Sequence, residues 1–433
     1  MKQKIALIQP NSPFLINERV FPNIGLVRVA TQLQSEGHET VILDYSGKKP
    51  QEIEFDIKNI ASDYDLYGFS STSPQFPYTM KIMNTLLNKN PDARTLIGGP
   101  HATALYHLRQ KGIKDINIDE LELFDTIFAG EGEDTLKIFG DRWQKGNLIK
   151  DLDSVLIPNR ELIDSYSYNY NLFNHSTASI QTQRGCPHQC AFCCGRDVEM
   201  YNKVRSHSPK RVIKELDQLN KDYGYSSFMV YDDEVNLNMG RLEELCFELT
   251  KRNYKFRGFI RSDNIVKYPE SVEWMKKAGF IKLCAGVESG SDRMLKAINK
   301  KTTSKMNSEA RDIIRKNGIH YEAFMLLGHP DETLDDVNLT YEWLKNNKPD
   351  DFDLNVITPY PGSKIYDDAI PSNKFEDYSW EYNGMFFNKP RYSKEDSFYK
   401  GIDAQSESNI RTNDLTNMQL KVIRDKIDGE LKK

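Results

Sequence analysis

Four of the six cysteines in the sequence fall within nine positions. The segment RGCPHQCAFCCGR spaces Cys186, Cys190 and Cys193 as C-x3-C-x2-C, and Cys194 follows directly. Three thiolates suit an iron–sulfur cluster that leaves one iron open, and an open metal position implies chemistry. The alternative is a zinc site completed by Cys194 or His188, because tetrahedral zinc sites use similar separations. The spacing therefore predicts a metal centre of one of these two kinds.

The cysteine loop directly follows the first strand of a βα series that begins at residue 177. Six strand candidates alternate with helical segments such as SPKRVIKELDQLNKDYG; they are ASIQTQRG, SFMVYDDE, RGFIRSD, IKLCAGVESG, YEAFMLLGHP and DLNVITPYPG. Six βα units predict an open barrel or a wound sheet, with chemistry at the carboxyl ends of the strands. We therefore expect the cysteines at the mouth of a partial (β/α)6 barrel over residues 177–365.

The first 140 residues read as a second α/β unit. Five apolar strand candidates alternate with helices; they are KIALIQP, ETVILDY, DLYGFSST, ARTLIGG and DTIFAGEGE. Crossover helices make such a sheet parallel, and its ligands bind at the carboxyl ends of the strands. Small or flexible residues gather there, so the loops admit a large ligand such as a nucleotide, a flavin or cobalamin. The candidate ligand-binding residues are Ser70, Ser71, Thr72, Gly98, Gly99, Pro100, His101, Glu131 and Gly132.

The rest of the chain lacks this periodicity. Residues 141–176 are rich in Asp, Asn, Ser and Tyr and are interpreted as a linker, and residues 366–433 are interpreted as a C-terminal cap. With 58 basic and 63 acidic residues the net charge is −5, without a strong block of either sign, which argues against nucleic-acid binding. No apolar run approaches the length of a membrane span, and the start turns polar too soon for a signal peptide. We expect a cytoplasmic protein.

Several segments in order resemble the cobalamin-dependent radical S-adenosylmethionine (SAM) enzymes, in which a cobalamin-binding α/β domain precedes the barrel. These segments are GLVRVATQLQSEGHE, GGPHAT, GEGEDT, the cysteine loop with Phe192 before its last ligand, DDE, GVESGS, GHPDET and TPYPGS. The similarity covers residues 4–365. It implies a flavodoxin-like domain at 1–140, a [4Fe–4S] cluster on Cys186, Cys190 and Cys193, and the cofactors SAM and cobalamin.

The resemblance also implies a SAM site at the strand ends of the barrel. Acceptors of the DDE run would bind the methionine ammonium, and residues after the third and fourth strands would bind its carboxylate and ribose. Gly328 and the turn at Tyr360 would let the backbone approach adenine. The structural alternatives are an acidic turn, an internal ion pair of Arg261 with a glutamate, and a plain tight turn. The SAM candidates are Phe192, Asp232, Asp233, Glu234, Arg261, Glu288, Ser289, Gly328 and Tyr360.

For function, the resemblance implies a methyltransferase that acts on an unactivated carbon of a small-molecule or peptide substrate. One SAM would methylate cob(I)alamin, a second would give the substrate radical, and an external donor would supply electrons. Many cobalamin domains hold cobalt with a histidine after the first strand, but this chain has PNSPFLIN there. Two alternatives stay open: rearrangement or cyclisation with the same cofactors, and a non-catalytic zinc or nucleotide-binding module.

Overall fold

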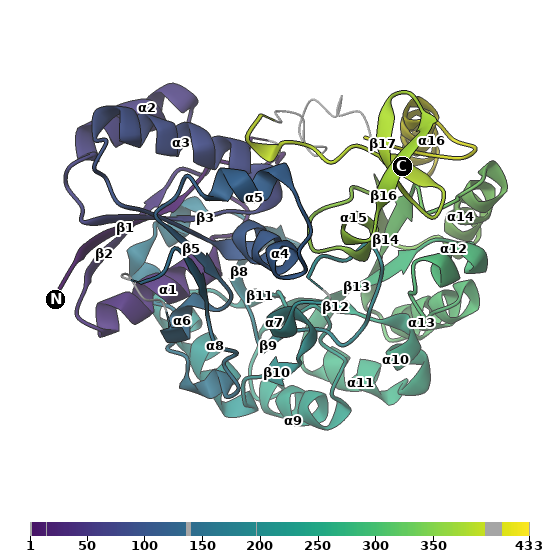
Figure 1. The fold of residues 1–433 in the computed structure, drawn as a ribbon. Coiled ribbons are helices and arrows are strands. Elements are labelled where there is room, and N and C mark those ends of the chain that lie inside the picture. Colours follow the sequence, from purple (N-terminus) through teal and green to yellow (C-terminus); the bar gives the residue numbers. More distant parts are fainter. Residues whose placement is uncertain (1, 14, 136–139, 196, 395–408, 433) are drawn as a thin grey trace. The chain divides into compact units, whose positions relative to one another are not determined.

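The computed structural model describes residues 2–13, 15–135, 140–195, 197–394 and 409–432, which form two compact units (Figure 1). The N-terminal unit comprises Met1–Tyr170, Val198–Met200 and Pro390–Ser406. The barrel unit comprises Asn171–Asp197, Tyr201–Lys389 and Glu407–Lys433. Most of the segment interpreted as a linker therefore packs with the N-terminal unit. Part of the predicted cap does so too, and residues 395–408 of that cap lie outside the described residues.

The N-terminal unit is built on one parallel sheet. Within the described residues the strand order is β2-β1-β3-β4-β5-β6, and every neighbouring pair is parallel. The strands are β1 (Lys4–Gln9), β2 (Glu39–Asp44), β3 (Leu66–Ser70), β4 (Thr95–Gly98), β5 (Thr126–Ala129) and β6 (Trp143–Lys145). The first five strands follow the flavodoxin order, which confirms the predicted fold. The short, half-exposed β6 was not predicted from the sequence.

Helices cover both faces of this sheet. They are α1 (Ile24–Ser35), α2 (Pro50–Ile60), α3 (Phe76–Lys89), α4 (Gly99–Gln110), α5 (Ile116–Leu121) and α6 (Gly132–Thr135). Figure 1 shows α2 and α3 on one face and α1 and α6 on the other. The helix α1 begins where the Asn23 side chain accepts a hydrogen bond from Leu26 N. Its apolar positions Leu26, Ala30 and Leu33 recur at helical spacing and join the core beside β1.

The barrel unit contains the six parallel strands expected from the sequence. Among the described residues its sheet runs β15-β14-β13-β12-β11-β8-β7, and only β7 (Asn171–Leu172) is antiparallel to its neighbour. The parallel strands are β8 (His175–Ile180), β11 (Ser227–Val230), β12 (Lys255–Ile260), β13 (Phe280–Glu288), β14 (His320–Leu327) and β15 (Asp351–Val356). This partial (β/α)6 barrel confirms the predicted fold class.

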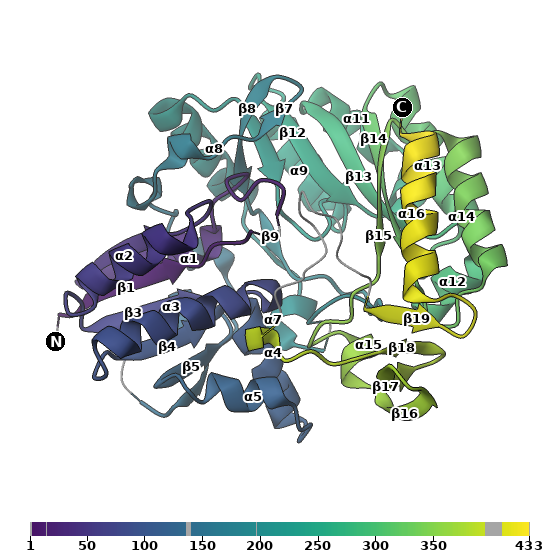
Figure 2. The same cartoon turned by 90° about the horizontal axis from the view of Figure 1, so that it is seen from above.

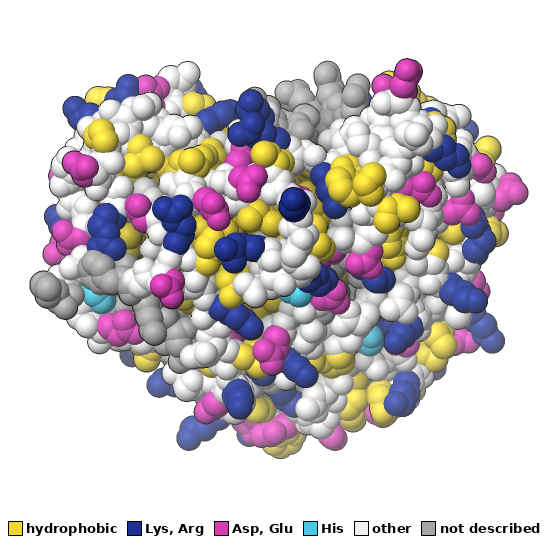
Figure 3. All heavy atoms as spheres, viewed as in Figure 1, with side chains coloured by type: hydrophobic (Ala, Val, Ile, Leu, Met, Phe, Trp, Pro, Cys, Tyr) yellow, Lys and Arg dark blue, Asp and Glu magenta, His cyan; other side chains and the backbone are white. Residues whose placement is uncertain are grey.

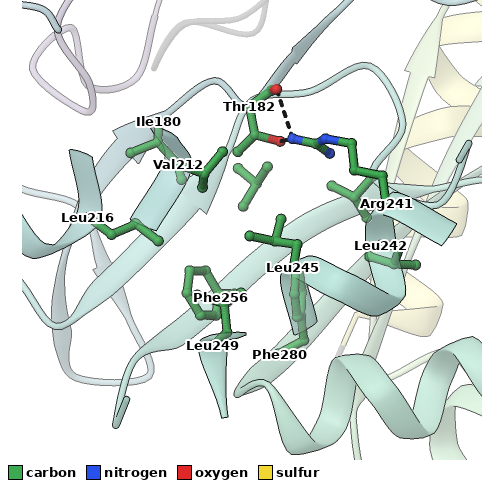
Figure 4. Close-up of a pocket in the computed structure, with 12 residues that line it drawn as sticks. Ile180, Thr182, Val212, Leu216, Arg241, Leu242, Leu245, Leu249, Phe256 and Phe280 are labelled. Carbon is green, nitrogen blue, oxygen red and sulfur yellow. Dashed lines mark hydrogen bonds between the residues drawn. The ribbon is translucent and has the colours of Figure 1, made fainter. Parts of the chain in front are cut away.

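The helices of the barrel unit have clear sequence signals. They are α8 (Pro209–Tyr223), α9 (Met239–Leu249), α10 (Ser262–Lys267), α11 (Glu270–Lys277), α12 (Asp292–Ala297), α13 (Ser304–Lys316), α14 (Leu334–Asn347) and α15 (Lys364–Asp367). The helix α8 has Ser208 as N-cap, Pro209 in its first turn, and Gly224 as a left-handed C-cap with φ 74°. Apolar side chains of α8, α9 and the sheet surround a small pocket, and Arg241 reaches Thr182 at its rim (Figure 4). This pocket belongs to the core behind the sheet.

A small antiparallel sheet and a helix follow β15 in the same unit. The sheet consists of β16 (Ile370–Phe375), β17 (Tyr378–Tyr382), β18 (Met385–Phe387) and β19 (Ile410–Thr412). The final helix, α16 (Asn417–Leu431), packs against β15 and α14, and Figure 2 shows it beside α14. The described part of the predicted cap thus forms one substructure, apart from Pro390–Lys394, which packs with the N-terminal unit.

Candidate active site

The cysteine loop is closed at its base by a two-stranded antiparallel ribbon. The strands β9 (Gln183–Arg184) and β10 (Arg205–Ser206) pair on either side of it, and the short helix α7 (Glu199–Asn202) lies between them in sequence. Gly185 has φ 86°, and a Cβ there would lie 2.2 Å from Lys203 O, so only glycine fits. Cys186 N then donates to Tyr201 O at 2.9 Å. The ribbon and this hydrogen bond therefore fix the position of the Cys186 backbone at the start of the loop.

The far half of the loop is held by segments distant in sequence. Ala191 N donates to Ile298 O, and Ala191 O accepts from Ile365 N. Gly195 N donates to Gly362 O in the TPYPGS turn at 2.6 Å. Within this frame Cys190 is buried and Cys186 and Cys193 are half-buried, whereas Cys194 is exposed. The exposure pattern separates the three predicted cluster ligands from the fourth thiol.

Two cations lie near the buried thiol of Cys190. Burial lowers the pKa of Lys300, but the charges of Glu288 and Cys190 outweigh burial and raise it. The pKa of Arg261 is raised in the same way: burial lowers it, and Asp263, Cys190 and Glu234 act in the opposite direction. Cations beside a thiolate stabilise its charged, ligating form. A buried thiol with two cations nearby, in one loop with two further half-buried thiols, fits an iron–sulfur cluster.

Asp232, predicted to bind the methionine ammonium, is hydrogen-bonded within the protein. It is 1% exposed, and its Oδ1 accepts from Thr182 N at 2.6 Å and from Gln183 N at 2.8 Å. Its Oδ2 accepts a hydrogen bond from the Thr182 hydroxyl, and that hydroxyl in turn accepts one from Arg241 Nη2. Burial raises the pKa of Asp232 to about 6, although these donors and Arg241 act to lower it. Both carboxylate oxygens of Asp232 thus anchor the chain leading into the cysteine loop, and its predicted role in SAM binding stays a prediction.

The other two members of the DDE run differ from each other. Asp233 is exposed, so it stays a candidate for ligand binding. Glu234 is fully buried, and its Oε1 accepts from Asn264 Nδ2 at 2.6 Å. Its Oε2 lies 3.2 Å from Nε2 of His188, which stands between two cluster cysteines in the chain. Glu234 is therefore the acidic side chain of this run that reaches the cysteine loop.

The predicted SAM residues after β12 and β13 are largely paired with protein groups. Arg261 forms a bidentate pair with Asp263, both bonds at 3.1 Å, and donates to Lys300 O at 2.7 Å. Glu288, with φ 65°, lies 2.7 Å from Lys300 Nζ, and both residues are under 10% exposed. The internal ion pair considered for Arg261 is thus present, although its partner is an aspartate. The SAM-binding roles of Arg261 and Glu288 stay predictions.

Ser289 and Gly328 both form hydrogen bonds within the protein. The Ser289 hydroxyl is fully buried, shares a hydrogen bond with Thr340 at 3.1 Å and accepts from Ser291 N. Gly328 has φ 79°, and its N–H donates to Glu332 Oε2 at 2.5 Å. Internal partners thus hold the Ser289 hydroxyl and the Gly328 N–H in their turns, and the predicted SAM contacts of both residues stay predictions.

The aromatic candidates stay predictions. Phe192 and Tyr360 are both half-buried, so part of each side chain is exposed. Tyr360 O accepts from the Ser363 backbone and hydroxyl, so the TPYPGS turn is ordered around this residue.

In the N-terminal unit, the loops after β3 and β4 are joined by their backbones. Ser71 N donates to Gly98 O at 3.2 Å, and His101 N donates to Ser71 O at 3.0 Å. Gly99 has φ 88°, and a Cβ there would lie 2.9 Å from Ser71 N. The two loops therefore approach each other closely because Gly99 has no side chain. This edge of small residues, with Thr72 half-buried and Pro100 exposed, fits the approach of a large ligand.

His101 is fully buried at this edge. Its Nδ1 lies 2.9 Å from Ser73 Oγ, and its ring contacts Phe76 and Tyr392 at centroid distances of 4.4 and 5.5 Å. Burial lowers its pKa to about 3, so the imidazole is neutral at physiological pH. Nε2 has no hydrogen-bond partner among the described residues. A cofactor role for His101 stays a prediction.

Two further candidates in this unit have structural partners. Glu131 is 3% exposed, and its Oε2 accepts from Ile149 N at 2.9 Å. A Cβ on Gly132 would lie 3.0 Å from Val29 of α1, so this glycine allows close packing. Both residues thus join the turn after β5 to neighbouring segments, and their predicted roles in cobalamin binding stay predictions.

Comparison with known proteins reveals two matching family models. A model of the B12 binding domain matches residues 18–139, and a model of the radical SAM superfamily matches residues 180–344. The first match lies on the flavodoxin-like sheet, and the second covers the cysteine loop and most of the partial barrel. The chain belongs to the cobalamin-dependent radical SAM enzyme family. Membership confirms the predicted cofactors, a [4Fe–4S] cluster, SAM and cobalamin, and makes the chain an enzyme, not a non-catalytic module.

Two curated relatives and one solved structure are similar to this chain over most of its length. An uncharacterised methyltransferase of Pyrococcus horikoshii is 27% identical over 87% of this chain and 85% of its own length. An anaerobic magnesium-protoporphyrin IX monomethyl ester cyclase of Rubrivivax gelatinosus is 26% identical over 73% of this chain and 61% of its own. The methyltransferase TsrM of Kitasatospora setae has a TM-score of 0.62 at 16% identity, covering 84% of this chain and 74% of that one. The structural similarity supports the family fold.

Sequence reasoning missed Lys300 as a site residue. It lies in the run NKK after α12, which has no motif character. Its importance depends on Glu288, 12 positions earlier, and on Cys190, more than 100 positions earlier, and folding brings both to it. Lys300 is only 7% exposed. Lysines are rarely buried without a partner, so this burial indicates a site residue, and it is visible only in the structure.

Proposed function

We propose that this enzyme transfers a methyl group from SAM to an unactivated carbon of a small-molecule substrate. The observation that carries this proposal is the match with a methyltransferase over 87% of this chain and 85% of the relative. The loop after β1 also supports it, because Pro10, Asn11 and Ser12 offer no imidazole there. A corrinoid held at this edge would therefore receive no imidazole from this loop, which fits its use as a methyl carrier.

The chain's own residues bind and shield the cofactors. When bound, the cluster, SAM and cobalamin supply the electron, the radical precursor and the methyl carrier. Cys186, Cys190 and Cys193 would hold the cluster, and the buried cations Lys300 and Arg261 would balance its negative charge. The Glu288–Lys300 pair would orient polar groups of SAM at the end of β13.

The reaction also sets two requirements outside the chain. Each reductive cleavage consumes one electron, so we infer an external electron donor as a partner. Free thiols and a reducible cluster persist in a reducing compartment, so we infer a cytoplasmic location. On the face of the molecule in Figure 3, basic and acidic side chains are interspersed, which fits the prediction that the enzyme does not bind nucleic acid. No described helix is both long and apolar enough to cross a bilayer.

The second candidate function is cyclisation or rearrangement without methyl transfer. The match with the cyclase supports it, although this chain covers only 61% of that relative. The two functions differ in their products. Methyl transfer predicts S-adenosylhomocysteine and 5′-deoxyadenosine in step with a substrate that gains one methylene unit.

The experiment is an anaerobic turnover with the reconstituted enzyme, methyl-labelled SAM and candidate substrates, read by mass spectrometry. Label in the product together with S-adenosylhomocysteine supports methyl transfer. Formation of 5′-deoxyadenosine in step with an unlabelled product, without S-adenosylhomocysteine, would reject it and favour the second function. The Cys186→Ala variant is the control, because it should form no 5′-deoxyadenosine.

A further inference from the structure

The cysteine loop also contains a set of donors that fits a single metal ion. Within the described part of the chain, the Cys, His, Asp and Glu ligand atoms that lie within 4.8 Å of one another belong to Cys186, His188 and Glu234. Glu234 is fully buried, and the His188 side chain is 22% exposed. Neither His188 Nε2 nor Glu234 Oε2 has a hydrogen-bond partner among the described residues, although they are 3.2 Å apart. An imidazole nitrogen and a carboxylate oxygen that lie against each other therefore converge beside a thiol.

The spacing matches one tetrahedral ion. Zinc lies about 2.0–2.1 Å from histidine nitrogen and about 2.0–2.2 Å from carboxylate oxygen, which places two such ligands about 3.4 Å apart at the tetrahedral angle. The observed 3.2 Å between Nε2 and Oε2 agrees with that value. In an iron–sulfur cluster each cysteine binds a different iron. The cluster therefore does not require donor atoms of several residues to meet around a single point.

Outer contacts hold these donors in place. Asn264 Nδ2 donates to Glu234 Oε1 at 2.6 Å, which leaves Oε2 for an ion. Gln183 Nε2 donates to Glu234 O, and Cys186 N donates to Tyr201 O. Such partners orient metal ligands and raise the affinity of a site.

We propose that the cluster-free protein binds one divalent transition-metal ion, such as Zn²⁺, through Cys186, His188 and Glu234, with water at the fourth position. Binding releases the Cys186 thiol proton to solvent and involves no oxidation or reduction. Because the cluster also needs Cys186, the two occupancies exclude each other, and zinc blocks cluster assembly. Only this competition depends on the cluster assignment; the binding of a single ion does not.

The test is a titration of iron-free full-length protein with Co²⁺ under anaerobic conditions. Tetrahedral cobalt with one thiolate gives visible d–d bands and a sulfur charge-transfer band, and Zn²⁺ should displace it. We expect His188→Ala and Glu234→Gln each to weaken Co²⁺ binding by more than the roughly 10–100-fold that loss of an outer-sphere partner costs. The matched control is Cys190→Ala/Cys193→Ala, which should bind Co²⁺ like the wild type. Circular dichroism checks the fold of every variant.

Reconstitution with iron tests the same variants for assembly of the cluster. His188→Ala should assemble about 4 Fe per chain, whereas Cys190→Ala/Cys193→Ala should assemble none. Preloading with Zn²⁺ should slow iron incorporation in the wild type and not in His188→Ala. Cobalt binding that is lost in the double cysteine variant but kept in His188→Ala would overturn the proposal, because the ion would then use the three cysteines. Absence of Co²⁺ binding to folded wild-type protein would overturn it as well.

Discussion

Removing the cation from the buried Lys300–Glu288 pair should destabilise the barrel unit strongly. Lys300 is 7% exposed, Glu288 is 6% exposed, and Nζ lies 2.7 Å from Oε1. At an effective dielectric constant near 20 this contact corresponds to about 6 kcal/mol of gross attraction, most of which offsets the desolvation of both charges. Lys300→Met leaves the carboxylate buried without its cation, a change that costs about 3–5 kcal/mol.

The assay is thermal unfolding of the cluster-free protein, with hydrogen exchange of the β13 peptides to locate the change. For a domain of roughly 150–250 residues, 1 kcal/mol shifts Tm by about 2–4 °C, so we expect Tm to fall by about 6–20 °C. Lys296→Met is the matched control, since Lys296 is exposed on the neighbouring helix α12. It should change Tm little, because an exposed substitution removes no buried contact.

A double variant separates the pair from the loss of lysine packing. Lys300→Met/Glu288→Gln leaves no unpaired charge, so it should be more stable than Lys300→Met alone. Two results would refute the reasoning: a Tm of Lys300→Met equal to that of Lys296→Met, or single-variant effects that simply add in the double variant.

Three further outcomes are expected. Alanine at any of the three predicted cluster cysteines should abolish iron binding and reductive SAM cleavage, whereas the exposed Cys194→Ala should retain both; equal iron loss in all four variants would contradict the ligand assignment. Because burial raises the pKa of Asp232 to about 6, the folded protein keeps a proton that the unfolded chain releases near pH 4. The stability of the wild type relative to Asp232→Asn should therefore fall by about 2 kcal/mol as pH rises from 4 to 6 in urea titrations, and a flat difference would count against this. Gly99→Ala, whose Cβ would meet Ser71 N at 2.9 Å, should weaken corrinoid binding in a visible-absorbance titration, whereas Gly112→Ala, with a similar φ of 72° and nothing within 4 Å, should not; equal effects of the two would argue against the close approach.

The element series could be predicted from the sequence because buried parallel strands are short apolar runs between helices of period 3.6. That pattern located five strands of the first sheet and six of the barrel. It missed β6, since Trp143–Lys145 is three residues long and only half-buried. It also could not assign Pro390–Lys394 to the N-terminal unit. That contact depends on Asn117, whose side chain bonds the backbone at Pro390 and Tyr392 more than 270 positions away.

The sequence by itself determined the chemistry that the chain carries, because three closely spaced cysteines and the strand-end motifs are local patterns. Only the tertiary structure decided which polar side chains at those strand ends are free. Asp232 follows its strand as a ligand-binding acid would, yet folding brings it the N–H groups of Thr182 and Gln183 from about 50 residues away. Lys300 is the opposite case: it belongs to no motif in the sequence, yet folding buries it beside Glu288 and Cys190. The physical reason is that a buried charge must find a partner, and partners distant in sequence meet only when the sheet is assembled.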